Sequence, residues 1–264
     1  MLTSSRVGIA SACLPMLHES GKCDVARVIV SSAKPSSRAR RLRRKLKKAM
    51  QIGLLGALNG LRMRAWYEGN STADVVEMCR HLGIPVFETD VTNSDVTVRL
   101  MMEAEADLGL SLGNSYIAHR VFSIPKFGMI NVHGERLPEY QNAQSVIWPI
   151  YHMETKTGLT VHQIDRSIDT GKILYREEYP IVFCAHLRDT VYATTKITRQ
   201  RTPGAVRYVC ENYERLTADA TPQENGHKFT TPNIWQFVRM IRNNRLLYNM
   251  AKSDMRNPAK SDTK

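Results

Sequence analysis

Two polar residues near the middle of the chain have types and spacing suited to chemistry. Asn131 and His133 lie two residues apart at the end of the apolar run GMINVH, which begins at Gly128. Because side chains alternate along a strand, both should point to the same side. Catalytic groups collect at strand ends in α/β sheets, although a buried Asn or His can also serve only to satisfy backbone groups.

A third residue of this kind is Asp169, the first residue of an Asp-Thr-Gly tripeptide that ends at Gly171. This tripeptide is associated with aspartic proteases, whose chemistry needs two carboxylates that share a proton. It occurs once here, and a homodimer that supplies a second copy suits a short all-β chain. Asp-Thr-Gly also makes a good turn, because Asp bonds nearby backbone and Gly accepts a positive φ. The protease interpretation is therefore disfavoured.

The elements that must position these residues alternate between strands and helices. Apolar and β-branched runs predict strands at 25–30, 84–88, 106–113, 128–133, 158–164 and 173–182. Periodic segments predict helices at 7–19, 71–83 (capped by Ser71 or Thr72), 94–105, 143–154 and 187–216. This alternation predicts a Rossmann-like α/β fold, with a mostly parallel sheet covered by helices on both faces. Only Met1 and Leu2 precede the first loop, so we expect a truncated first strand and leave open a start of translation upstream.

The composition of the 264 residues suits one large domain with a small appendage. We predict a catalytic domain over 1–216, a linker over 217–232, an amphipathic helix over 233–250 and a disordered tail. The chain has no apolar run long enough to cross a bilayer, and its five scattered cysteines lack C-x-x-C spacing. The first residues lack a basic region followed by an apolar segment, so we do not expect a secretory signal. These features predict a cytoplasmic protein with reduced thiols and no metal site.

The net charge of +12 is concentrated in a basic insertion at about 34–66. Its centre, Arg38 to Lys48, reads RARRLRRKLKK, and no Asp or Glu occurs between Lys34 and Arg64. One interpretation is a contact with RNA or an anionic membrane, and the other is a solvated basic helix. The apolar continuation AMQIGLLGALNGLRM makes an amphipathic helix, which favours a membrane surface or a protein partner over RNA.

Several spaced motifs together resemble the folate-dependent formyltransferase family. The matching segments are Asn131-Val-His133, Leu137-Pro-Glu-Tyr140, Glu154 to Thr160, and Asp169-Thr-Gly171. The resemblance is dense between Ser111 and Pro180 and looser from about residue 3 to 215. It implies the formyltransferase fold and the transfer of a formyl group from 10-formyltetrahydrofolate, as co-substrate, to a primary amine.

The same resemblance implies roles for individual residues. Asn131, His133 and Asp169 become the catalytic trio: Asn131 and a protonated His133 would donate to the oxyanion, and Asp169 would relay a proton. No metal and no covalent enzyme intermediate is required. Backbone groups would bind the pterin at Leu112, Gly113, Asn114, Ser115, Tyr116, Ile117, Asp165 and Ile168. We expect His162 to be a wall residue.

The amine acceptor is the least determined feature. The sequence departs from the family at Gly134 to Arg136, and the family's Tyr-Arg-Gly is Tyr140-Gln141-Asn142 here. Both changes border the amine side, and Tyr140, Gln141 and Asn142 are predicted to bind the substrate. Gly134 and Trp148 resemble the formyltransferases that act on nucleotide-linked amino sugars, and we expect such an acceptor. The alternatives are methionyl-tRNA, bound through the basic segment, and a non-catalytic descendant that binds RNA or another anionic ligand.

Overall fold

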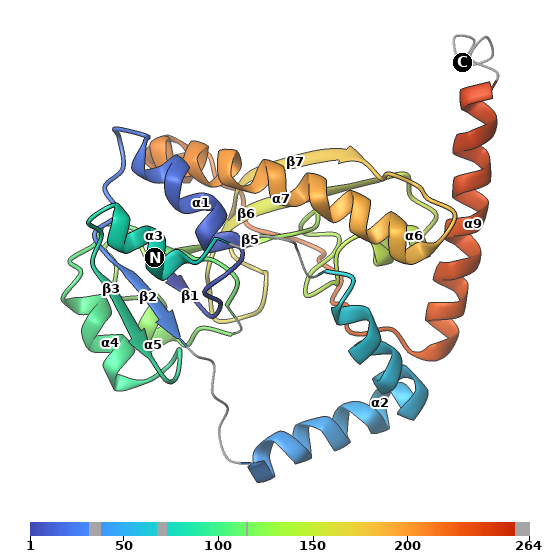
Figure 1. Ribbon diagram of the computed structural model, residues 1–264, viewed down its shortest axis with the longest axis horizontal. Helices are drawn as coiled ribbons and strands as arrows, with labels where there is room; N and C mark the ends of the chain where they lie inside the picture. The colour runs from blue at the N-terminus through green and yellow to red at the C-terminus, as the bar shows by residue number, and fades with distance from the viewer. Residues whose placement is uncertain (32–37, 68–72, 115, 257–264) are drawn as a thin grey trace.

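A seven-stranded sheet of order β3-β2-β1-β4-β5-β6-β7 forms the centre of the computed structural model (Figure 1). The structure describes residues 1–31, 38–67, 73–114 and 116–256. The strands are β1 (Leu2–Thr3), β2 (Val28–Ser31), β3 (Val86–Thr89), β4 (Gly109–Ser111), β5 (Met129–His133), β6 (Lys156–Gln163) and β7 (Ile173–Pro180). Strands β1 to β5 pair in parallel, whereas β6 and β7 are antiparallel to their neighbours. The prediction of a mostly parallel α/β sheet is confirmed.

The first strand is short yet central. Leu2 pairs with Ile29 of β2 on one side and with Ser111 of β4 on the other. Its side chain is fully buried, so this two-residue strand is an integral part of the sheet. A cavity of about 820 Å³ lies next to Met1, between residues 25–27 and 108–110.

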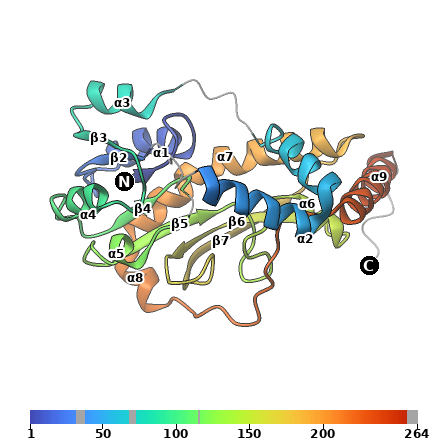
Figure 2. The same cartoon turned by 90° about the horizontal axis from the view of Figure 1, so that it is seen from below.

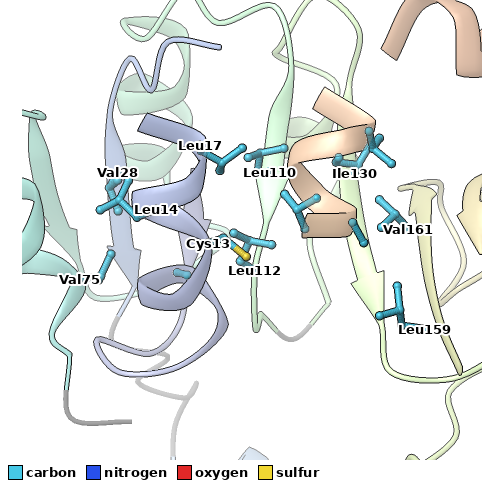
Figure 3. Close-up of a cluster of buried hydrophobic side chains, with 14 of the residues drawn as sticks. Cys13, Leu14, Leu17, Val28, Val75, Leu110, Leu112, Ile130, Leu159 and Val161 are labelled. Atoms are coloured by element: carbon cyan, nitrogen blue, oxygen red, sulfur yellow. The ribbon is translucent and has the colours of Figure 1, made fainter. Parts of the chain in front are cut away.

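Helices cover both faces of the sheet (Figures 1 and 2). They are α1 (Ile9–His18), α2 (Arg38–Arg64), α3 (Val75–His81), α4 (Asp95–Met102), α5 (His119–Phe122), α6 (Ile147–Tyr151), α7 (Leu187–Glu211), α8 (Tyr213–Ala218) and α9 (Ile234–Arg256). Apolar residues of α1, α3 and α7 pack on one face in a core that includes Leu14, Leu110 and Val161 (Figure 3). Residues of α4 and α5 pack on the other face, against Leu2, Ile29 and Met129.

The predicted C-terminal helix is present as α9 and belongs to a second core. Phe237, Met240 and Leu247 of α9 are buried with residues of α6, including Trp148 and Ile150. Met63 of α2 and the neighbouring Trp66 join the same cluster, and the rings of Trp66 and Phe237 lie 5.8 Å apart. The helix therefore anchors the end of the basic insertion to the body of the protein.

The segment predicted as a linker, 217–232, packs against the fold. The Gln141 N–H donates to the His227 carbonyl, the Phe229 N–H donates to the Gln141 carbonyl, and the Asn142 amide donates to the Phe229 carbonyl. The Phe229 ring lies 4.6 Å from Trp148 and 5.3 Å from Tyr140. The polar composition of 217–232 predicted a linker, because hydrogen bonding to a distant segment leaves no signal in the local sequence.

Other boundaries also differ from the predictions. The helix expected over 187–216 is divided at Asn212 into α7 and α8. Asp74 caps α3 by accepting from the Val76 N–H at 2.8 Å, whereas Ser71, Thr72 and the predicted disordered tail at 257–264 lie outside the described residues. Within the described part of the chain, no helix is both long and apolar enough to span a membrane.

Candidate active site

Antiparallel pairing of β5 with β6 brings three polar side chains to one face of the sheet. Asn131 pairs directly with His162, and His133 pairs with Thr160. Side chains of directly opposed residues share a face, as do residues two apart on one strand. The Asn131 Nδ2 lies 3.3 Å from the His162 Nε2. His162 was expected in the wall of the site, and the structure places it within hydrogen-bond distance of the predicted trio.

The carboxylate of Asp169 lies between the two histidines. Its Oδ2 is 3.4 Å from the His133 Nδ1, and its Oδ1 is 3.5 Å from the His162 Nε2. The backbone N–H of Asn142 donates to Oδ2 at 2.9 Å. Only about a tenth of the Asp169 side chain is exposed. The structure therefore brings together the three residues predicted from sequence, with His162 as a fourth member.

The turn before β7 presents this carboxylate. Asp169 has a φ of 57°, a conformation that Asp tolerates better than most residues. The Asp165 carboxylate accepts from the Ser167 N–H at 2.9 Å and from the Thr170 hydroxyl at 2.6 Å, which fixes the loop. A Cβ at position 171 would lie 1.9 Å from the Gln163 carbonyl oxygen, so only glycine fits there. The turn role and the site role of Asp-Thr-Gly are thus compatible.

Asp169 is held in its ionised form. Burial alone would raise its pKa, but the hydrogen bond to His162 and the proximity of His133 outweigh that effect and lower the pKa below 3.8. For His133 the balance is reversed, because burial lowers its pKa below 6.5 despite the favourable charge of Asp169. Burial thus disfavours the cationic form of His133, while the neighbouring carboxylate of Asp169 favours it.

Both ring nitrogens of His133 have partners. Its Nε2 lies 2.7 Å from the Tyr140 carbonyl, which requires an N–H at Nε2, and its Nδ1 faces Asp169. His162 is anchored in turn, because its Nδ1 donates to the Gln163 carbonyl at 2.8 Å. Each imidazole is thus oriented by a backbone carbonyl on one side and contacts Asp169 on the other.

A cavity of about 460 Å³ opens beside these residues, a volume typical of small-molecule sites. Asn131, His133, His162 and Asp169 line it. Of the residues predicted to bind folate, those that also line it are Gly113, Asn114, Tyr116, Ile117, Asp165 and Ile168. Leu112 does not line it, because its side chain is buried in the core, and Ser115 lies outside the described residues.

The residues predicted to bind the acceptor divide into two groups. Asn142 lines the cavity, whereas Tyr140 and Gln141 are buried away from it. The Tyr140 hydroxyl donates to Glu154 at 2.7 Å, and the Gln141 amide donates to Gln223 at 3.0 Å. Trp148 is likewise only 3% exposed and packs on Phe229. Tyr140 reaches the site through its carbonyl alone, which holds His133.

A buried carboxyl group supports the loop that carries these contacts. Glu135 has no exposed surface and accepts from the Val146 N–H at 2.5 Å and from the Thr157 hydroxyl at 2.7 Å. Burial raises its pKa to about 7, although these hydrogen bonds act in the opposite direction. Val146 has a φ of 70°, which is strained for a β-branched residue. The Glu135 side chain therefore fixes the end of the loop 140–146 from the strand side.

No group of three or more His, Cys, Asp or Glu side chains with the geometry of a metal site occurs among the residues that the structure describes. The site residues instead form an amide, two imidazoles and one ionised carboxylate around a cavity. This set can donate a hydrogen bond to an oxyanion and can accept and release a proton.

The family model for formyl transferases matches residues 68–204, more than half of the chain. The chain belongs to this family. The match includes all four residues of the site, and the predicted family resemblance is confirmed.

This formyl transferase is also similar to methionyl-tRNA formyltransferases. It is 37% identical to that of Trichodesmium erythraeum over 100 residues, which are 37% of this chain and 30% of the relative. It is 29% identical to that of Parabacteroides distasonis over 150 residues, which are 56% and 44% of the two chains. The chain thus spans less than half the length of these relatives.

Solved structures show the same fold at low sequence identity. Phosphoribosylglycinamide formyltransferase from Anaplasma phagocytophilum superposes on this formyl transferase with a TM-score of 0.54 at 16% identity, over 80% of this chain and 85% of that one. The sugar 3N-formyl transferase WlaRD, solved with dTDP and 5-N-formyl-THF, gives a TM-score of 0.51 at 16% identity, over 96% and 80% of the chains. At such identities these comparisons establish the formyltransferase fold.

Proposed function

We propose that this formyl transferase moves a formyl group from 10-formyltetrahydrofolate to a primary amine. The observation that carries the proposal is the convergence of Asn131, His133 and Asp169 on one cavity, within the segment that matches the family. An ionised carboxylate flanked by two oriented imidazoles beside an amide donor suits acyl transfer without a metal or a covalent intermediate.

The cavity wall is compatible with a folate head group bound by backbone. The Asn114 side chain is occupied by the fold, because its amide donates to the Leu2 carbonyl at 2.6 Å and its oxygen accepts from the Ser4 hydroxyl at 2.8 Å. Gly113 next to it has a φ of 79°, which suits a turn that exposes backbone groups. We infer that backbone groups of 112–117 and of the turn 165–169 bind the pterin ring, as the family resemblance implies.

The site residues can be assigned to separate steps of the transfer. The amine nitrogen forms a bond to the formyl carbon, the bond from that carbon to folate N10 breaks, and one proton moves from the amine to N10. Asn131 is the donor that we assign to the intermediate oxyanion. Asp169 accepts the proton, directly or through a water, and returns it to N10. His133 and His162 hold Asp169 in position. The sequence predicts a direct hydrogen bond from His133 to the oxyanion. For this bond to form, one ring nitrogen of His133 must give up its contact with the Tyr140 carbonyl or with Asp169.

Two acceptors have separate support. Methionyl-tRNA is favoured by the methionyl-tRNA formyltransferases among the relatives and by a basic helix, α2, which lies on the side of the sheet where the parallel strands end (Figure 2). A nucleotide-linked amino sugar is favoured by Gly134 after His133, but Trp148 is buried and does not line the cavity. The predicted cytoplasmic location remains a prediction.

A turnover assay tests the proposal. The protein is incubated with 10-formyltetrahydrofolate and, separately, with methionyl-tRNA, a nucleotide-linked amino sugar and glycinamide ribonucleotide, and the formylated amine is measured. We expect one acceptor to be formylated and the product to be lost in His133→Ala and Asp169→Asn. Turnover that survives both substitutions contradicts the catalytic assignment. Binding of RNA with no turnover on any amine supports the non-catalytic alternative.

A further inference from the structure

Helix α2 carries exposed apolar side chains on both sides of its bend. Leu42, Leu46 and Met50 follow one another at four-residue spacing, which places them on one face of the helix. After the bend at Gly53, where φ is 75°, a second apolar face follows with Leu54, Leu55, Leu58 and Leu61. These seven side chains are between 55% and 86% exposed. Isolated exposed leucines are common, but a patch of this extent marks a binding surface.

The same helix is strongly basic. Its sequence contains no Asp or Glu between Arg38 and Arg64, and Arg43, Lys47, Arg62 and Arg64 are exposed. The hydrophobic face and the cations therefore belong to one element, which makes α2 a basic amphipathic helix with no apolar partner for its outer face among the described residues.

Helix α9 carries a second exposed apolar face with basic residues. It contacts α2, and a Cβ at position 56 or 60 of α2 would meet residues 231–233 at its start, so the two helices are closely joined. Its outer side exposes Trp235, which is 79% accessible, together with Val238, Ile241, Leu246 and Met250. Arg239, Arg242 and Arg245 are interspersed among them. Figures 1 and 2 show that the second half of α2 lies near the start of α9 and that both helices lie outside the sheet.

We propose that α2 and α9 form a docking surface for an anionic lipid membrane. A basic amphipathic helix binds such a surface by burying its apolar face at the level of the headgroups while its Lys and Arg contact the anionic lipids. Trp235 suits this region as well, because indole rings concentrate at membrane interfaces. The helices lie on the membrane and do not cross it.

Two other candidate partners, RNA and a second copy of this chain, match the surface less well than a membrane does. The phosphate backbone of RNA satisfies the cations but leaves the seven exposed apolar side chains of α2 in water. A symmetric contact with a second copy buries the apolar face but brings the same cationic helix against itself. An anionic membrane satisfies both the charge and the apolar surface.

Co-flotation of the full chain with vesicles tests the surface. We expect binding to vesicles that contain phosphatidylglycerol, weak binding to pure phosphatidylcholine, and weakening by salt. Leu46→Ser with Met50→Ser, and Arg43→Glu with Lys47→Glu, should each reduce the affinity at least about tenfold. The matched controls are Val96→Ser with Met102→Ser on α4 and Lys22→Glu with Lys196→Glu, which change exposed residues elsewhere and should bind as the unmodified protein does.

Tryptophan emission gives a second readout that does not depend on these variants. Trp66 and Trp148 are buried, so a blue shift on vesicle addition should come from Trp235 and disappear in Trp235→Phe. Absence of vesicle binding, or equal binding by the variants and the unmodified protein, overturns the proposal. It is also overturned if Arg43→Glu with Lys47→Glu abolishes RNA binding and no vesicle binding occurs, or if the leucine and methionine changes only dissociate a dimer.

Discussion

Asn131 and His162 stand directly opposite each other on β5 and β6, with the amide Nδ2 and the ring Nε2 3.3 Å apart. The same Nε2 lies 3.5 Å from Asp169. Through this pair, the strand that carries Asn131 and His133 is connected to the turn that carries the carboxylate. His162 is almost completely buried, so it is a fixed part of the site.

Replacing His162 by methionine should lower turnover roughly tenfold to a hundredfold, because Asp169 loses one of the groups that hold it. The loss of the contact with the His162 ring should also raise the pKa of Asp169. The acid limb of the pH–rate profile should therefore move to higher pH. His119→Met, an exposed histidine on α5, is the control and should leave the profile unchanged. An unshifted acid limb in His162→Met would show that His162 does not act on Asp169.

Asp169→Asn should lower turnover by about 10² to 10⁴, because the amide cannot accept the proton from the amine. Asparagine tolerates the φ of 57° at this position, so the turn should be retained. Steady-state kinetics with the accepted amine measure the effect, and Asp95→Asn on the surface is the control. Wild-type turnover in Asp169→Asn would remove Asp169 from the proton relay.

Glu135 should make the protein less stable as the pH rises from 4.5 to about 7. Its pKa in the folded state is about 7 against 4.5 when unfolded, so the folded protein binds an extra proton in this window. The stabilisation contributed by protonated Glu135 is fully present below pH 4.5 and is lost as the pH rises through 7. The effect is on the order of 3 kcal/mol of unfolding free energy.

Glu135→Gln removes this titration while the side-chain oxygen can still accept from Val146 and Thr157. Denaturant unfolding at several pH values between 4 and 8 should show a smaller decline of stability for the variant than for the unmodified protein. Parallel pH dependences in the two proteins would contradict the raised pKa of Glu135.

Gly171→Ala should disrupt the turn that presents Asp169. The new Cβ would lie 1.9 Å from the Gln163 carbonyl, and relief requires a backbone shift that costs about 1 to 3 kcal/mol. We expect both the unfolding midpoint and the turnover to fall. Gly204→Ala in α7 is the matched control, since nothing lies within 4 Å of its added Cβ. That change should stabilise the helix by about 0.5 to 1 kcal/mol. Normal activity in Gly171→Ala would show that the turn adapts.

Sequence patterns predicted those parts of the site that depend on local geometry. Asn131 and His133 had to share a face because strand residues alternate, and Asp169 had to lie in a turn because of Thr170 and Gly171. His162, on the strand before this turn, was predicted to be a wall residue. The register between β5 and β6 places it opposite Asn131, and that register depends on pairing between strands that are far apart in the sequence.

The amino-acid sequence by itself determined the α/β class, the family motifs and the basic amphipathic insertion, because periodicity, turn chemistry and charge are local properties. Tertiary structure decided which side chains meet. It turned Tyr140 and Trp148 away from the cavity, and it joined 217–232 to Gln141 and Asn142 through backbone hydrogen bonds. It also packed α9 against α2 and α6. The physical reason is that burial and long-range pairing depend on the whole set of neighbours, which no single segment of the chain specifies.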